Sequence, residues 1–149
     1  MIKLVDLIKE NTRGRNRLKS ISFVTSLVPL LIAAAQNKYD SWDQNDDGED
    51  VELGGGGICQ DIADAICSVL IDKGVECATV SATIGEQHVY CVAKLKEGVY
   101  EVDISPYTYE SGGGYTWRKI PNVSFSKDDL IIHRLNADPK KFNQYTDEY

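Results

Sequence analysis

Three residues in the middle of the chain have the side-chain types and the order of a cysteine-based acyl-transfer site: Cys59, His88 and Asp103. A cysteine that attacks a carbonyl carbon reacts as the thiolate, and a neighbouring base activates it. A histidine can take the thiol proton and later return it, while a carboxylate fixes its tautomer and stabilises its positive form. This order assigns the attack on an amide or ester carbonyl to Cys59, proton transfer to His88 and orientation of the ring to Asp103.

Cys59 opens the clearest predicted helix of the chain. Apolar residues follow it at spacings of three and four, which is typical of a single buried helix face: Ile62, Ala63, Ile66, Cys67 and Leu70. Gly74 follows this pattern and indicates the end of the helix. Cys59 is therefore expected in the first turn, facing the protein. Free N–H groups and the positive helix end stabilise a thiolate and a developing oxyanion there, and the glycines at 54–57 would let a substrate approach.

His88 and Asp103 are expected on two neighbouring strands, 88–95 and 99–104, joined by a hairpin at Lys96, Glu97 and Gly98. An even number of loop residues places His88 and Asp103 on the same side of the sheet, and an odd number places them on opposite sides. With Glu97 and Gly98 as the turn, the numbers of facing residues sum to 195; a four-residue loop gives 193 and sets Asp103 diagonally beside His88. The pattern leaves the register open.

The remaining elements predict an α+β fold, because helices come first and strands follow. Helices are expected over 2–10 and 21–36, the second with a kink near Pro29, and a polar loop over 40–57. Further strands are expected over 75–84, 115–120 and 129–135, with a loop after Pro106. We expect one domain over 1–149, with its core at 55–105 and a loosely held tail at 137–149.

The stretch from 55 to 105 resembles the transglutaminase-like cysteine-protease superfamily. The matching positions run in the family's order: Gly57, Cys59, Asp61, Ala63, Leu70, Gly74, Val75, His88 and Asp103. The resemblance implies a papain-like fold, with N-terminal helices packed on a small antiparallel sheet, a thioester intermediate and no metal or organic cofactor. Members include peptidases, transglutaminases, deamidating and deglycosylating enzymes, and proteins that have lost activity.

The sequence departs from this family at the oxyanion donor. Papain-like enzymes carry a glutamine about six residues before the cysteine, and Leu53 stands there. Trp42 and Gln44, further upstream, are the candidates to replace it. The candidates for the substrate cleft are Gly57, Tyr90 and Tyr107.

The acidic run before the glycines has a competing interpretation as a calcium loop. Asp43, Asn45 and Asp47, followed by Gly48, match the opening of an EF-hand loop. A full loop ends on a bidentate Glu at its twelfth position, and that position is Gly54. A solvated acidic turn is therefore favoured, and no metal site is expected.

The net charge of −7 argues against general binding to nucleic acid or an anionic membrane. The apolar stretch 21–35 is shorter than a membrane span and contains Pro29, so a buried helix is expected. None of the four cysteines forms a CxxC pair, and Cys67, Cys77 and Cys91 lie in apolar segments as core residues would. These features favour a reducing, cytoplasmic location over secretion.

The sequence thus predicts a cysteine peptidase that acts on a peptide or protein through Cys59. Two alternatives stay open. One is an amidase, deamidase or transglutaminase of the same fold, and the other is an inactive module that docks a basic protein partner. The sequence leaves open the substrate, the acceptor, which is water or an amine, and the oligomeric state.

Overall fold

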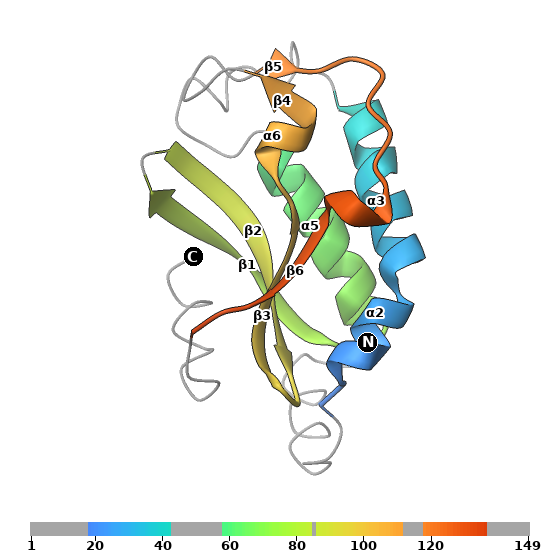
Figure 1. Cartoon of the computed structure of the whole chain (residues 1–149), viewed down its shortest axis with the longest axis vertical. Coiled ribbons are helices and arrows are strands. Elements are labelled where there is room, and N and C mark those ends of the chain that lie inside the picture. Colours follow the sequence, from blue (N-terminus) through green and yellow to red (C-terminus); the bar gives the residue numbers. More distant parts are fainter. Residues whose placement is uncertain (1–17, 43–57, 85, 112–117, 137–149) are drawn as a thin grey trace, which may run out of the picture.

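The computed structural model describes residues 18–42, 58–84, 86–111 and 118–136. It has an α+β fold, in which helices lie along one face of a four-stranded antiparallel sheet (Figure 1). The helices are α2 (Ile21–Ser26), α3 (Val28–Ser41), α5 (Ile58–Asp72) and α6 (Pro106–Tyr109), and a 3₁₀ turn spans Lys127–Asp129. The strands are β1 (Glu76–Ile84), β2 (Glu86–Leu95), β3 (Gly98–Ile104), β4 (Glu110–Ser111), β5 (Arg118–Lys119) and β6 (Leu130–Arg134).

The helix predicted over 21–36 is two helices. The Ser20 side chain caps α2 by accepting a hydrogen bond from the Phe23 N–H, and α2 ends before Leu27. Pro29 then lies in the first turn of α3, where its missing N–H costs nothing. α3 also continues to Ser41, beyond the predicted end, and buries Tyr39.

Helix α5 confirms the prediction from the apolar pattern. Its buried face includes Ile62, Ile66 and Leu70, all fully enclosed, and it contacts α3 on one side and β1, β2 and β3 on the other. The helix ends as expected: Gly74 has φ +81°, and the N–H of Val75 donates to the carbonyl of Leu70 at 2.8 Å.

The sheet has the strand order β1-β2-β3-β6. Leu95 faces Gly98 across a two-residue turn at Lys96 and Glu97, so the numbers of facing residues sum to 193. The structure therefore has the alternative register, reached by a two-residue turn one position earlier rather than by a four-residue loop. Gly98 is the first residue of β3, and its φ of +143° suits glycine.

The segment after Pro106 differs from the predicted loop. It forms α6 and then β4, which pairs with β5, so the strand predicted over 115–120 is described only at Arg118–Lys119. Strand β6 confirms the strand predicted over 129–135 and pairs with β3. The helix predicted over 2–10 and the tail at 137–149 lie outside the described residues, as does most of the predicted loop 40–57.

The main core lies between the helices and the sheet. It joins Leu31 and Ala35 of α3 and the apolar face of α5 to Cys91 and Ala93 of β2. A smaller cluster is centred on Val80, Val92 and Val99. Within the described ranges, no helix is both long and apolar enough to cross a membrane.

Candidate active site

His88 and Asp103 form a close pair between β2 and β3. Nε2 of His88 lies 2.7 Å from Oδ2 of Asp103, within hydrogen-bond and ion-pair distance. The histidine side chain is 25% exposed, whereas the aspartate side chain is only 1% exposed. The imidazole is therefore held from within the protein and keeps one edge near the surface.

The strand register explains how two residues 15 positions apart meet. Backbone pairing of β2 with β3 runs from Leu95–Gly98 to Cys91–Val102. Continued one step, the same register sets residue 103 opposite residue 90, diagonally beside residue 88. Both side chains thus lie beyond the last paired residues, on one side of the sheet, as an even loop length requires.

The pair has strongly shifted proton affinities. Burial disfavours the charged ring of His88, but the hydrogen bond to Asp103 and the neighbouring Cys59 outweigh it and raise the pKa of His88 to about 10. Burial raises the pKa of Asp103 to about 6, although the hydrogen bond to His88 acts in the opposite direction. Between these values the pair is an imidazolium held by a carboxylate.

Cys59 lies at the start of the described part of α5, half-buried, with a free thiol. It raises the pKa of His88 through hydrogen bonding and negative charge, so its sulfur lies near the ring. The second ring nitrogen, Nδ1, is buried and has no hydrogen bond of ordinary geometry to any described residue. The structure therefore brings the three predicted residues together, with Nε2 engaged by Asp103 and Nδ1 uncommitted.

Two further residues of this site, Tyr109 and Glu110, were not predicted from the sequence. The hydroxyl of Tyr109 is buried without a hydrogen-bond partner in the described part of the chain. Burial first, and then the charges of Asp103 and Cys59, raise its pKa well above the ordinary value. Burial also raises the pKa of Glu110 to about 7, while the positive charge of His88 partly offsets this rise. Both residues follow Pro106, in the segment predicted to be a loop.

An aromatic cluster positions Tyr109 at the end of α6. Its ring makes edge contacts with Tyr39, at 6.2 Å between centroids, and with Phe125, at 5.9 Å. Its carbonyl accepts a hydrogen bond from the N–H of Ile120. The ring is thus fixed by packing, which leaves the hydroxyl near the charged groups of the site.

The weaker candidates have different positions. Trp42, at the end of α3, is 8% exposed, and its indole N–H is buried without a partner among the described residues. Tyr90 stacks on His88, with 5.8 Å between ring centroids. Tyr107 is 77% exposed on α6. Gln44, Gly57 and the possible calcium ligands Asp43, Asn45 and Asp47 lie outside the described residues.

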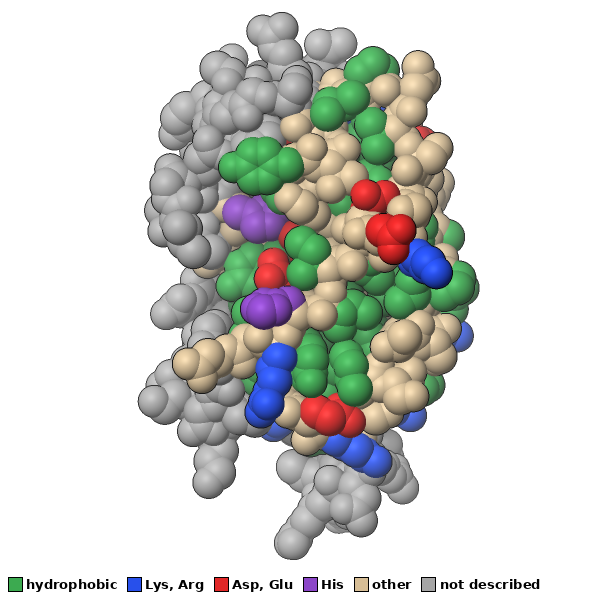
Figure 2. Space-filling view, in the orientation of Figure 1, with side chains coloured by type: hydrophobic (Ala, Val, Ile, Leu, Met, Phe, Trp, Pro, Cys, Tyr) green, Lys and Arg blue, Asp and Glu red, His purple; other side chains and the backbone are tan. Residues whose placement is uncertain are grey.

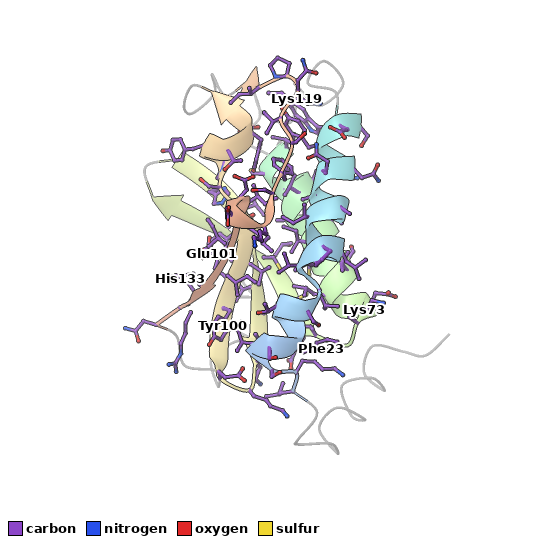
Figure 3. The ribbon with its side chains drawn as sticks, turned by 45° about the vertical axis from the view of Figure 1, so that its right-hand side comes forward. Phe23, Lys73, Tyr100, Glu101, Lys119 and His133 are labelled. Carbon is purple, nitrogen blue, oxygen red and sulfur yellow. The ribbon has the colours of Figure 1, made fainter. Side chains whose placement is uncertain are left out.

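One group at the site could hold a metal ion. Ligand atoms of His88, Glu101 and Asp103 lie within 4.8 Å of one another. Glu101 of β3 faces His133 of β6, and both are labelled in Figure 3 on the sheet. The face drawn in Figure 2 shows both histidines close to acidic side chains, beside exposed hydrophobic ones. An acidic side chain, Glu101, therefore lies beside His88 and Asp103 at the site.

Comparisons of the chain with family models, with curated proteins and with solved structures find no match.

Proposed function

We propose that this protein is a cysteine-dependent acyl-transfer enzyme that cleaves or transfers an amide bond through a thioester on Cys59, and that it acts as a small peptidase. The observation that carries the proposal is the buried His88–Asp103 pair at 2.7 Å, next to a cysteine at the start of a helix. A buried carboxylate that orients an imidazole beside a thiol is the arrangement that nucleophilic catalysis by cysteine needs.

In the proposed reaction, Nδ1 of His88 is the ring nitrogen that gives and takes protons, because Asp103 holds Nε2. His88 holds the proton as an imidazolium, and Cys59, paired with it as the thiolate, attacks the carbonyl carbon of the substrate. The ring then protonates the leaving amine as the carbon–nitrogen bond breaks, which leaves a thioester on Cys59. His88 next takes a proton from water or an acceptor amine, which attacks the thioester and releases the acyl group. Asp103 holds Nε2 throughout and stabilises the imidazolium.

The oxyanion formed during each attack needs donors. Backbone N–H groups in the first turn of α5 are one source, because the first N–H groups of a helix have no partner within it. The hydroxyl of Tyr109 is a second, since it is buried, lacks a protein partner among the described residues and lies near Cys59. The indole N–H of Trp42 shares the first two properties and is a third candidate.

The papain-like and transglutaminase-like fold is part of this proposal. Three features support it: a helix that carries Cys59 in its first described turn, an antiparallel sheet against that helix, and a histidine and an aspartate on adjacent strands. The free thiols of Cys59, Cys67, Cys77 and Cys91 support a reducing compartment such as the cytoplasm. The proposed substrate is a peptide or protein.

Trapping of the acyl-enzyme tests the proposal. The full-length protein is mixed with an activated acetyl ester such as p-nitrophenyl acetate, quenched in acid, and analysed by intact-mass and peptide mass spectrometry. We expect one acetyl group on Cys59 and a burst of nitrophenol, and neither in Cys59→Ser. Failure of wild type to acylate at Cys59 contradicts the proposal and favours the non-catalytic binding module.

The metal-ligand group provides a second arm of this test. If His88, Glu101 and Asp103 instead hold a catalytic cation, EDTA and Glu101→Gln will both abolish the burst. The cysteine mechanism predicts that both leave the burst unchanged, because Nε2 of His88 is engaged by Asp103 and Glu101 has no part in it.

A further inference from the structure

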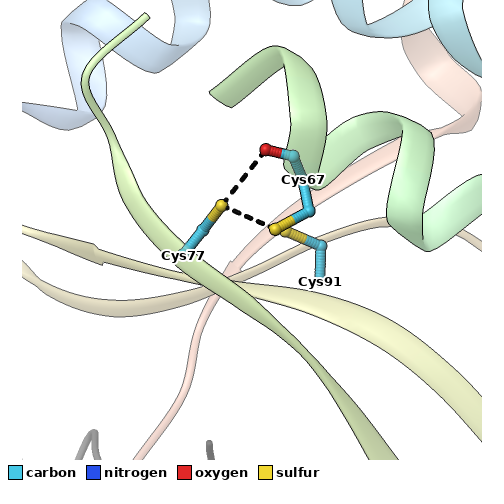
Figure 4. Close-up of side chains that lie close together, drawn as sticks. All are labelled: Cys67, Cys77 and Cys91. Atoms are coloured by element: carbon cyan, nitrogen blue, oxygen red, sulfur yellow. Dashed lines mark hydrogen bonds between the residues drawn. The ribbon is translucent and has the colours of Figure 1, made fainter. Parts of the chain in front are cut away.

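The three cysteines other than Cys59 form a cluster of thiols at the core. Cys67 of α5, Cys77 of β1 and Cys91 of β2 bring their sulfur atoms within 4.8 Å of one another (Figure 4). The Sγ atoms of Cys67 and Cys77 lie 2.9 Å apart. The Cys77 sulfur also contacts the Cys67 carbonyl at 3.4 Å. Two thiols from adjacent elements thus lie against each other, with a third beside them.

The three thiols differ in exposure. Cys91 is fully buried and Cys67 is 7% exposed, whereas Cys77 is half-buried on β1, at the edge of the described sheet. The close pair is therefore nearer to solvent than the third thiol. Cys77 is the more exposed thiol of this pair, so an oxidant that approaches the pair comes from the side of Cys77.

Charge, rather than distance, favours a disulfide over a metal site here, because the 2.9 Å between the two sulfurs fits neither without a shift. Sulfurs that share one zinc ion lie about 4 Å apart, because each Zn–S bond is about 2.3 Å long, so this pair would have to separate. A disulfide needs about 2.05 Å, so the pair would have to close. Three thiolates around one cation would also leave net negative charge in an apolar core, which is costly, whereas a disulfide is neutral.

We propose that Cys67 and Cys77 are an oxidisable dithiol that hydrogen peroxide converts to a disulfide between α5 and β1. Hydrogen bonds from Cys77 and Cys91 lower the pKa of Cys67, which favours Cys67 as the thiol that loses its proton and reacts. The Cys67 thiolate attacks peroxide, breaks its O–O bond, becomes a sulfenic acid and releases hydroxide. The Cys77 sulfur then forms the S–S bond and displaces the sulfenic oxygen, which leaves as water with the Cys77 proton. Overall, two thiols and one peroxide give one disulfide and two waters.

Cys91 has a separate role in this reaction. It is the third member of the cluster and donates to Cys67 without being consumed. A disulfide between Cys67 and Cys77 would tie the helix that begins near Cys59 to the edge of the sheet.

Thiol counting and mapping test the dithiol independently of the proposed acyl transfer. The full chain carrying Cys59→Ser retains three thiols and is treated with one equivalent of hydrogen peroxide. We expect the free thiols to fall from three to one, with Cys91 as the survivor. Cleavage after Glu52, Glu76 and Glu86 places Cys67, Cys77 and Cys91 on separate peptides, so non-reducing mass spectrometry identifies the linked pair.

Two added substitutions serve as matched controls. Cys91→Ser in the same background should still form the disulfide, and Cys67→Ser should keep both of its thiols. If three thiols persist, if a thiol is lost without a disulfide, or if the bond maps to Cys91, the proposal is wrong. The Cys59→Ser protein alone decides this, even if a core substitution prevents folding.

Discussion

Nε2 of His88 lies 2.7 Å from Oδ2 of Asp103, and the aspartate side chain is almost completely buried. The aspartate therefore fixes the ring from within the protein and leaves Nδ1 for the thiol of Cys59. An ion pair on the surface would contribute little to the stability of the protein. Here the aspartate is buried, so the pair controls both the charge and the orientation of the imidazole.

Replacement of Asp103 by Asn keeps the shape of the side chain and removes its charge. We expect the pKa of His88 to fall by about 1–3, because an adjacent carboxylate favours the charged ring and raises this pKa to about 10 in the wild type. NMR titration of the imidazole protons measures it, and His133→Gln assigns the two histidines. An unchanged His88 titration in Asp103→Asn would show that the carboxylate does not control the ring.

The stability of the protein should depend on pH through His88. Its pKa in the folded protein, about 10, lies above the ordinary value of 6.5. Its stabilising contribution is therefore fully present below pH 6.5 and is lost as pH rises through about 10. Urea unfolding of wild type and His88→Gln from pH 6 to 10.5 should show a difference in unfolding free energy that shrinks as pH rises. A difference that stays constant contradicts this assignment.

Tyr109→Phe separates a structural hydroxyl from a functional one. The buried hydroxyl has no partner among the described residues, so its removal should leave the unfolding free energy unchanged or raise it by about 1 kcal/mol. If this hydroxyl donates a hydrogen bond to the oxyanion, Tyr109→Phe should lower the burst rate, which reports acylation of Cys59, roughly 100-fold.

Tyr39→Phe is the matched control for this prediction. Its hydroxyl is also buried without a described partner, and its ring packs against Tyr109. Burial first, then the charges of Asp40 and Glu110, raise its pKa, and neither of those residues takes part in the proposed chemistry. We expect Tyr39→Phe to leave the burst rate unchanged. Equal losses in the two variants would mean that the ring cluster, rather than the Tyr109 hydroxyl, supports the site.

The apolar face of α5 should contribute strongly to stability. Leu70 is fully buried, so Leu70→Ala should lower the unfolding free energy by about 2–5 kcal/mol. Ile71, the next residue, is 59% exposed, and Ile71→Ala should change it by less than about 0.5 kcal/mol. Urea unfolding of both variants checks this, and similar losses would contradict the burial of this face.

The sequence predicted α5 well because local signals agree there. An apolar residue at every third or fourth position and Gly74 at the end both follow from helix geometry. The side shared by His88 and Asp103 was predicted as a condition on loop length, since only the parity of the loop matters. The register itself was left open from the sequence, and the structure has the one in which Lys96 and Glu97 form the turn and Gly98 begins β3.

Features that depend on tertiary packing were not predicted. The polar end of α3 continues to Ser41 because Tyr39 packs against Tyr109 and Phe125, which come from distant parts of the chain. The approach of Cys67, Cys77 and Cys91 has the same origin, since their spacing matches no metal-site pattern. Pro106 at the start of α6 is a local signal for a helix, but the burial of Tyr109 depends on its packing against Tyr39 and Phe125.

The rate of alkylation of Cys59 measures its activation by His88. Wild type and His88→Ala are treated with limiting iodoacetamide at pH 7, and the rate at each cysteine is followed by peptide mass spectrometry. We expect Cys59 to be the fastest-reacting thiol in wild type and His88→Ala to slow it at least about 10-fold, while Cys77 keeps its rate. Equal Cys59 rates in the two proteins would contradict the activation of Cys59 by His88.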